Sequence, residues 1–234
     1  MRKIGLITIG QSPREDLVSL MRSYLTQEVD ILQRGALDGL DLSMVAQLQP
    51  EAGQPALVTR MRDGSEVEVS HEKILPLMQK EVEALVEEGV ELIVLLCTGE
   101  FAGLQAERMI LHPGKLLHGV ITALANGARL GVVVPSASQI PLTEEKRKER
   151  WGGSDIVATS VSPYAEAEIK VREWKRAAGV LKEREADLVY LDCMGMDEEM
   201  KRIVQQVTHK PVILACSVVA RMVDELIGPG ERAH

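Results

Sequence analysis

Short runs of aliphatic residues alternate along the whole chain with longer amphipathic segments. Such alternation is typical of β-strands joined by α-helices, and so of a mostly parallel sheet. The runs are rich in Val, Ile and Leu and nearly continuous, as in strands that are buried on both faces. We therefore predict strands at residues 4–9, 29–32, 92–96, 116–120, 130–134, 156–159, 188–191 and 212–215.

The segments between these runs carry helix signals. Ser12 is followed by Pro13 and, three residues after the serine, by Glu15. This is the pattern of a capping box, and it predicts a helix that begins at Ser12 and ends near Leu25. Apolar residues at helical spacing predict further helices at residues 74–88, 165–185 and 217–227.

One stretch, residues 56–70, departs from this pattern. Its polar and apolar residues alternate on both sides of Asp63-Gly64, which is a strong turn signal between two antiparallel strands. We predict a β-hairpin inserted into the otherwise parallel architecture.

The order of the predicted elements is repeated along the chain. RKIGLITIG at residues 2–10 resembles RLGVVVPS at residues 129–136, and a turn, a helix and a strand follow each. In each copy a third strand then ends in a cysteine, Cys97 in the first and Cys193 in the second. The chain is therefore predicted to contain two copies of one α/β half. We assign residues 1–123 with 216–234 to the first lobe and residues 124–215 to the second.

Composition narrows the classes of function. The net charge of −8 argues against nucleic-acid partners and anionic membrane surfaces, both of which need a basic face. No apolar run approaches the ~20 residues that span a bilayer, and the N-terminal apolar stretch is too short for a signal peptide. Three scattered cysteines indicate free thiols in the cytoplasm. No metal-ligand spacing and no cofactor fingerprint is present, so neither a metal nor a cofactor is expected.

Both cysteines stand at the carboxyl ends of predicted strands, where open parallel sheets bind their ligands. If the two halves pack face to face about a pseudo-two-fold axis, the thiols meet across one cleft. Gly99 and Gly195 would let backbone amides approach a ligand, and the helix N-termini behind them would favour thiolate and hold a carboxylate. A thiolate and a thiol on opposite sides of a substrate suit removal of an α-proton and its return from the other face.

The alternative interpretation is that these cysteines are structural. Free cysteine is among the most buried residue types and is usually an inert, small apolar residue. Cys216 has no counterpart in the first half, and we interpret it as a packing residue.

The layout of two halves, each with a cysteine at the end of its third strand, resembles the aspartate/glutamate racemase superfamily. More closely, the chain resembles the AroM family, through the stretches GLITIGQSPR, QRGALDGL, PEAGQPALVTRMRDG, LIVLLCTGE and LVYLDCMG. The resemblance implies an α/β fold of two flavodoxin-like parallel-sheet halves related by a pseudo-two-fold axis. It puts Cys97 and Cys193 in the positions of the paired acid/base cysteines, but it implies no defined activity for AroM proteins.

The resemblance also indicates residues around the substrate. It places Gly10, Gln11 and Ser12 in the loop that helps to hold a substrate carboxylate. Racemases usually have polar residues after both cysteines, whereas here Thr98-Gly99 and Met194-Gly195 follow. This departure argues against an amino acid and leaves open the isomerisation or decarboxylation of another carboxylate. We add to the candidate site Arg34, which could pair with a carboxylate, and Ser136 and Ser162 in the matching loops of the second half, although each of these serines also has an ordinary turn role.

Two functions remain open at this stage. The first is a cofactor-independent, racemase-like isomerase, or a related lyase, that acts on a small carboxylate. The second is a non-catalytic sensor that binds a small anionic metabolite, with a link to aromatic amino-acid biosynthesis through the family's name. A purely structural partner protein is the least favoured. The resemblance also allows a homodimer, which nothing in the sequence itself specifies.

Overall fold

The computed structural model describes residues 2–51, 54, 56–125, 127–151, 155–164 and 167–228. The chain divides into two compact units, residues 1–114 with 219–234 and residues 115–218. The boundaries predicted from the sequence are 123/124 and 215/216. Both ends of the chain therefore belong to the first unit, and the second unit is one continuous segment.

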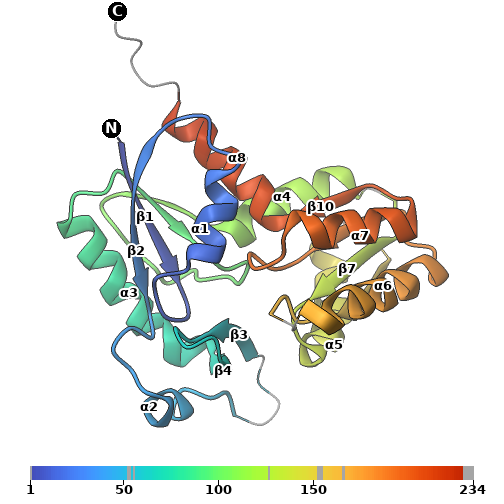
Figure 1. Ribbon diagram of the computed structural model, residues 1–234, viewed down its shortest axis with the longest axis horizontal. Helices are drawn as coiled ribbons and strands as arrows, with labels where there is room; N and C mark the ends of the chain where they lie inside the picture. Colours follow the sequence, from blue (N-terminus) through green and yellow to red (C-terminus); the bar gives the residue numbers. More distant parts are fainter. Residues whose placement is uncertain are drawn as a thin grey trace, which may run out of the picture. The chain divides into compact units, whose positions relative to one another are not determined.

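The first unit contains a parallel sheet of four strands (Figure 1). Its strands, in spatial order, are β2 (Val29–Gly35), β1 (Arg2–Thr8), β5 (Leu92–Leu95) and β6 (Met109–Leu111). Ile4 pairs with Ile31 on one side and with Leu92 on the other. β5 is buried along its whole length, which explains why its sequence is uniformly aliphatic.

The second unit contains a parallel sheet with the same topology. Its strands, in spatial order, are β10 (Val212–Leu214), β9 (Leu188–Leu191), β7 (Leu130–Val134) and β8 (Ile156–Ser160). Read from β8 to β10, and with strands numbered along the chain within the sheet, the order is second, first, third and fourth. The first sheet has the same order when it is read from β2 to β6. This is the flavodoxin-like arrangement. The prediction of two flavodoxin-like parallel-sheet α/β halves is confirmed.

Helices connect the strands in both units. They are α1 (Glu15–Arg22), α2 (Leu42–Ala46), α3 (His71–Glu87), α4 (Pro113–Leu124), α5 (Ile140–Arg150), α6 (Ala167–Glu183), α7 (Glu198–Thr208) and α8 (Ala215–Ile227), with a 3₁₀ turn, η1 (Ala137–Gln139), before α5. α3 buries Ile74, Met78, Val82 and Leu85 in the first core, and Leu85 packs where Gly5 leaves room in β1. Trp174 of α6 is fully buried in the second core.

The inserted hairpin is confirmed. β3 (Ala56–Arg60) and β4 (Glu66–Ser70) pair in antiparallel register, from Ala56 with Ser70 to Arg60 with Glu66. The turn is fixed by Asp63, whose carboxylate accepts hydrogen bonds from the backbone and the hydroxyl of Ser65. The hairpin forms a sheet of its own, separate from the parallel sheet of its unit.

Two predictions of local structure are wrong. The run at residues 116–120 is not a strand, because it lies inside α4. Pro113, Leu117 and Ile121 are buried at four-residue intervals, which is helical spacing that a window of five residues cannot show. The fourth strand of the first sheet is instead β6, a three-residue edge strand that was not predicted. α1 begins at Glu15 and not at Ser12, and its N-cap residue makes no side-chain cap.

Candidate functional site

The two predicted catalytic cysteines occupy equivalent places in the two units. Cys97 comes two residues after the end of β5, and Cys193 two residues after the end of β9. Both side chains are partly exposed, whereas Cys216 is fully buried in α8. None of the three cysteines is joined in a disulfide.

The two cysteine sulfurs share a specific backbone contact. The N–H of Gly99 donates to Sγ of Cys97 at 3.3 Å, and the N–H of Gly195 donates to Sγ of Cys193 at 3.4 Å. A hydrogen bond from an N–H group stabilises negative charge on its acceptor. The N–H groups of Gly99 and Gly195 are therefore directed at Cys97 and Cys193 in the same way, although the two cysteines belong to different units with separate sheets.

The Cys97 loop (residues 96–101) is held by the hairpin and by the start of α3. A Cβ atom on Gly99 would lie 3.3 Å from Leu57 of β3 and 3.3 Å from Phe101. The Phe101 ring is stacked on His71 with 5.0 Å between centroids, and the His71 ring also contacts the backbone oxygen of Glu100. The inserted hairpin thus forms part of the surroundings of the Cys97 loop.

The Cys193 loop (residues 192–197) has a different setting. Met194 is only 1% exposed and so belongs to the interior. The hydroxyl of Tyr164 lies 3.0 Å from the position that a Cβ of Gly195 would take, so this tyrosine packs directly on the loop. Asp192 is buried and accepts a hydrogen bond from Tyr190 at 2.9 Å, which gives it a structural role.

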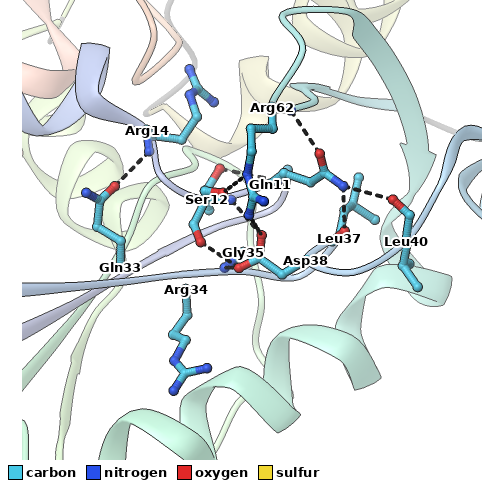
Figure 2. Close-up of polar contacts among 12 residues, drawn as sticks. Gln11, Ser12, Arg14, Gln33, Arg34, Gly35, Leu37, Asp38, Leu40 and Arg62 are labelled. Carbon is cyan, nitrogen blue, oxygen red and sulfur yellow. Dashed lines mark hydrogen bonds and ion pairs between the residues drawn. The ribbon is translucent and has the colours of Figure 1, made fainter.

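The β1 loop (residues 9–14) is engaged with other parts of the first unit (Figure 2). Ser12 donates its N–H and its hydroxyl to the carboxylate of Asp38 at 2.8 and 2.6 Å. The Gln11 amide donates to the backbone oxygens of Leu37 and Leu40, and its own oxygen accepts from the N–H of Arg62. The predicted ligand residues of this loop are therefore all held by internal partners.

Arg34 is directed elsewhere. Its guanidinium contacts Glu88, just beyond α3, and lies 3.9 Å from Glu81 of the same helix. Figure 2 shows its side chain extending to the side opposite Ser12 and Asp38. The structure does not bring Arg34 together with the β1 loop.

Arg14 is a buried charge that the sequence analysis missed. Its side chain is 5% exposed and holds Asp16 through two hydrogen bonds, of 2.9 and 2.7 Å. Burial alone would raise the pKa of Asp16. The hydrogen bond and the charge of Arg14 outweigh this effect, and the N–H of Leu17 and the charge of Arg60 act in the same direction as Arg14. The pKa of Asp16 is therefore held below its ordinary value. Nothing in the local sequence distinguishes Arg14 from an exposed arginine.

The serines predicted in the second unit stabilise turns. Oγ of Ser136 accepts from the N–H of Ser138 at 3.3 Å, and the two hydroxyls are 2.9 Å apart. Oγ of Ser162 accepts from the N–H of Tyr164 at 3.1 Å. Within the described residues, no group of three or more His, Cys, Asp or Glu side chains is placed to hold a metal ion. No described helix has the length and apolar character needed to cross a bilayer.

An open pocket of about 730 Å³ lies beside the β1 loop. It is formed by that loop, by the segment that enters α2, and by the hairpin turn. Its lining residues are Gln11, Leu40, Asp41, Leu42, Ser43, Met61, Arg62 and Asp63.

Comparison with solved structures defines the class of fold. The chain is similar to allantoin racemase from Klebsiella pneumoniae, with a TM-score of 0.64 and 18% identity over 97% of this chain and 88% of that one. It is similar to an aspartate racemase from Picrophilus torridus, with a TM-score of 0.60 and 13% identity over 97% and 94% of the two chains. Arylmalonate decarboxylase gives a TM-score of 0.61 and 14% identity over 99% and 95%. At these identities the likeness is one of fold, and the fold is that of the aspartate/glutamate racemase-like proteins.

The family follows from the sequence. The chain belongs to the AroM family, because the family model described as AroM protein matches residues 4–227. No curated protein matches the chain.

Proposed function

We propose that this protein is a cofactor-independent, racemase-like isomerase, or a lyase of the same fold, that acts on a small carboxylate with Cys97 and Cys193 as its acid/base pair. The observation that supports this most directly is the equal local geometry of the two thiols. Each follows the third strand of its sheet, and each accepts an N–H from the residue two positions on. Such a match between the two units supports a shared role for the two thiols.

The chemistry follows from this pair. One sulfur, as thiolate, takes the proton from the carbon next to the substrate's carboxylate, and the electron pair of the broken C–H bond delocalises into that carboxylate. The other sulfur, as thiol, gives its proton to the same carbon from the opposite face. In a lyase the C–H cleavage is replaced by loss of carbon dioxide, and one thiol protonates the carbanion that remains. A positioned acid or base of this kind contributes about 10²–10⁴-fold.

Proteins of similar fold are named for both kinds of reaction. They include racemases for allantoin, aspartate and glutamate, the last in complex with D-glutamate, and arylmalonate decarboxylase. For this chain we propose a small organic acid as substrate, with Thr98 as the side chain beside Cys97 that contacts it. We also propose a cytoplasmic location, because cysteines that form no disulfide suit a reducing compartment.

A non-catalytic anion sensor is the second candidate. One observation weighs against catalysis at the β1 loop: its donors, which the racemase resemblance assigns to a substrate carboxylate, are taken by Asp38. A sensor of the same fold would bind its anion through other groups and would not need these donors.

The test is hydrogen exchange in deuterated water. The protein is incubated with a panel of α-substituted carboxylates, and loss of the α-proton signal is followed by NMR. We expect exchange for a subset of the panel, and we expect Cys97→Ser and Cys193→Ser each to reduce it by about 10²-fold or more. Cys216→Ala is the matched control, because this thiol is fully buried in α8.

The outcomes separate the two candidates. Exchange that survives both serine substitutions would rule out the paired-cysteine mechanism. Binding of a carboxylate without exchange, unchanged in either serine variant, would establish the sensor.

A further inference from the structure

Three hydrogen bonds and one ion pair converge in the first unit on one carboxylate, that of Asp38. Its Oδ1 accepts from the N–H of Ser12 at 2.8 Å, and its Oδ2 accepts from the Ser12 hydroxyl at 2.6 Å and from the N–H of Gly35 at 2.9 Å. The guanidinium of Arg62 lies 3.5 Å from Oδ1. Backbone N–H groups together with an arginine form the usual lining of an anion-binding site.

The backbone around the Asp38 carboxylate is closely packed. A Cβ on Gly35 would lie 2.5 Å from the Gly10 oxygen, 2.6 Å from the Ser12 nitrogen and 2.9 Å from Oδ1 of Asp38. Only glycine lets the end of β2 approach the β1 loop this closely. The two backbone donors, the N–H groups of Ser12 and Gly35, are therefore fixed by this close approach of main chain.

The inserted hairpin completes the arrangement (Figure 2). Besides facing Asp38, the Arg62 side chain donates to the Ser12 oxygen at 2.8 Å, and the Arg62 N–H donates to the Gln11 side chain at 2.9 Å. The N–H of Gln11 in turn donates to the Arg60 oxygen at 3.1 Å. No hairpin of this kind is described in the second unit, so among the described residues a hairpin arginine faces the first-strand loop of the first unit only.

We propose that the end of β1 is an anion-binding site whose resident anion is the carboxylate of Asp38, and that the hairpin, through Arg62, closes this site. Asp38 is then a positioning residue for the β1 loop, and the donors of Ser12 bind Asp38 rather than the substrate. The site takes one small carboxylate, and it accepts formate when the carboxylate of Asp38 is removed. This inference stands apart from the proposed catalytic function, because its test uses no activity.

The test is chemical rescue of stability in the full chain. Asp38→Gly removes the carboxylate and leaves space for formate, and we expect its Tm to be roughly 5–10 °C below that of the wild type. Added formate should raise this Tm in a saturable manner and recover at least half of the loss. Formamide, which has the same shape without the charge, and sodium chloride at equal ionic strength should not.

Asp41→Gly is the matched control. Asp41 also accepts a backbone N–H and a serine hydroxyl, from Met44 and Ser43, but it is exposed and faces no arginine in the described contacts. Formate should leave its Tm unchanged. A formate response in Asp38→Gly no larger than in Asp41→Gly or the wild type would overturn the proposal, and so would an Asp38→Gly variant that stays unfolded at every formate concentration.

A second variant tests the site without rescue. Asp38→Asn keeps the shape of the side chain but turns an NH₂ group toward donors, so it should melt well below the wild type. If Asp38→Asn melts at the wild-type temperature, the site does not require an anion and the proposal fails.

Discussion

Gly10→Ala is the substitution for which the structure gives the sharpest expectation. A Cβ on Gly10 would lie 2.3 Å from the backbone oxygen of Arg60 and 2.5 Å from Oγ1 of Thr59. Ordinary contacts between non-bonded heavy atoms are about 3.5–4.0 Å, so the new methyl group needs a shift of about 1 Å. The oxygen is backbone in β3, and Thr59 is 1% exposed, so neither neighbour can move alone.

The expected destabilisation by Gly10→Ala combines two costs. Overpacking of an ordered interior costs about 1–3 kcal/mol. The shift also weakens the 3.1 Å hydrogen bond from the N–H of Gln11 to the Arg60 oxygen, which contributes about 1 kcal/mol. We therefore expect Gly10→Ala to lower the free energy of unfolding by about 2–4 kcal/mol.

The assay is urea denaturation followed by circular dichroism. Gly179→Ala is the matched control, because a Cβ at this position inside α6 would meet no atom within 4 Å. It should stabilise the protein by about 0.5–1 kcal/mol through helix propensity. If Gly10→Ala is as stable as the wild type, the close approach of the hairpin to the β1 loop is wrong.

Two further predictions concern charge and thiol reactivity. The pKa of Asp16 is held below its ordinary value of 3.8, so the stability that its ionised form contributes is fully present above that value and is lost as the pH falls through the lowered pKa. The Tm advantage of wild type over Asp16→Asn should therefore be constant near neutral pH and vanish in strong acid; an advantage that persists there would contradict the role of the Arg14 pair. Iodoacetamide should label Cys97 and Cys193 in the native protein and reach Cys216 only after unfolding. Mass spectrometry of the peptides checks this, and equal native labelling of all three would refute it.

Most of the fold could be predicted because the relevant signals are local. Continuous aliphatic runs gave β7 and β9 with their observed bounds, and Asp63-Gly64 located the hairpin turn. The errors arose where a local signal is ambiguous. β6 has only three residues at the edge of its sheet, and the five-residue run within α4 is too short to show the helical period repeating.

The candidate site could be predicted only in part, because its partners are distant in sequence. The motif at Ser12 matches a capping box, yet its hydroxyl bonds Asp38, 26 residues away. Arg62 reaches the same loop from 50 residues away, along the hairpin. Arg34 lies near the end of β2, but its side chain is directed to Glu81 of α3 and to Glu88. The direction of a long side chain is decided by tertiary neighbours, which one sequence does not specify.

The way the chain threads through its two units has a consequence for biosynthesis. Residues 219–227 return to the first unit, where Asp224 holds Thr26 and the Leu226 oxygen accepts from Arg2. Because synthesis runs from the N-terminus, the continuous second unit leaves the ribosome whole while the first still lacks its last helix. The unit that is begun first is thus the one that is finished last.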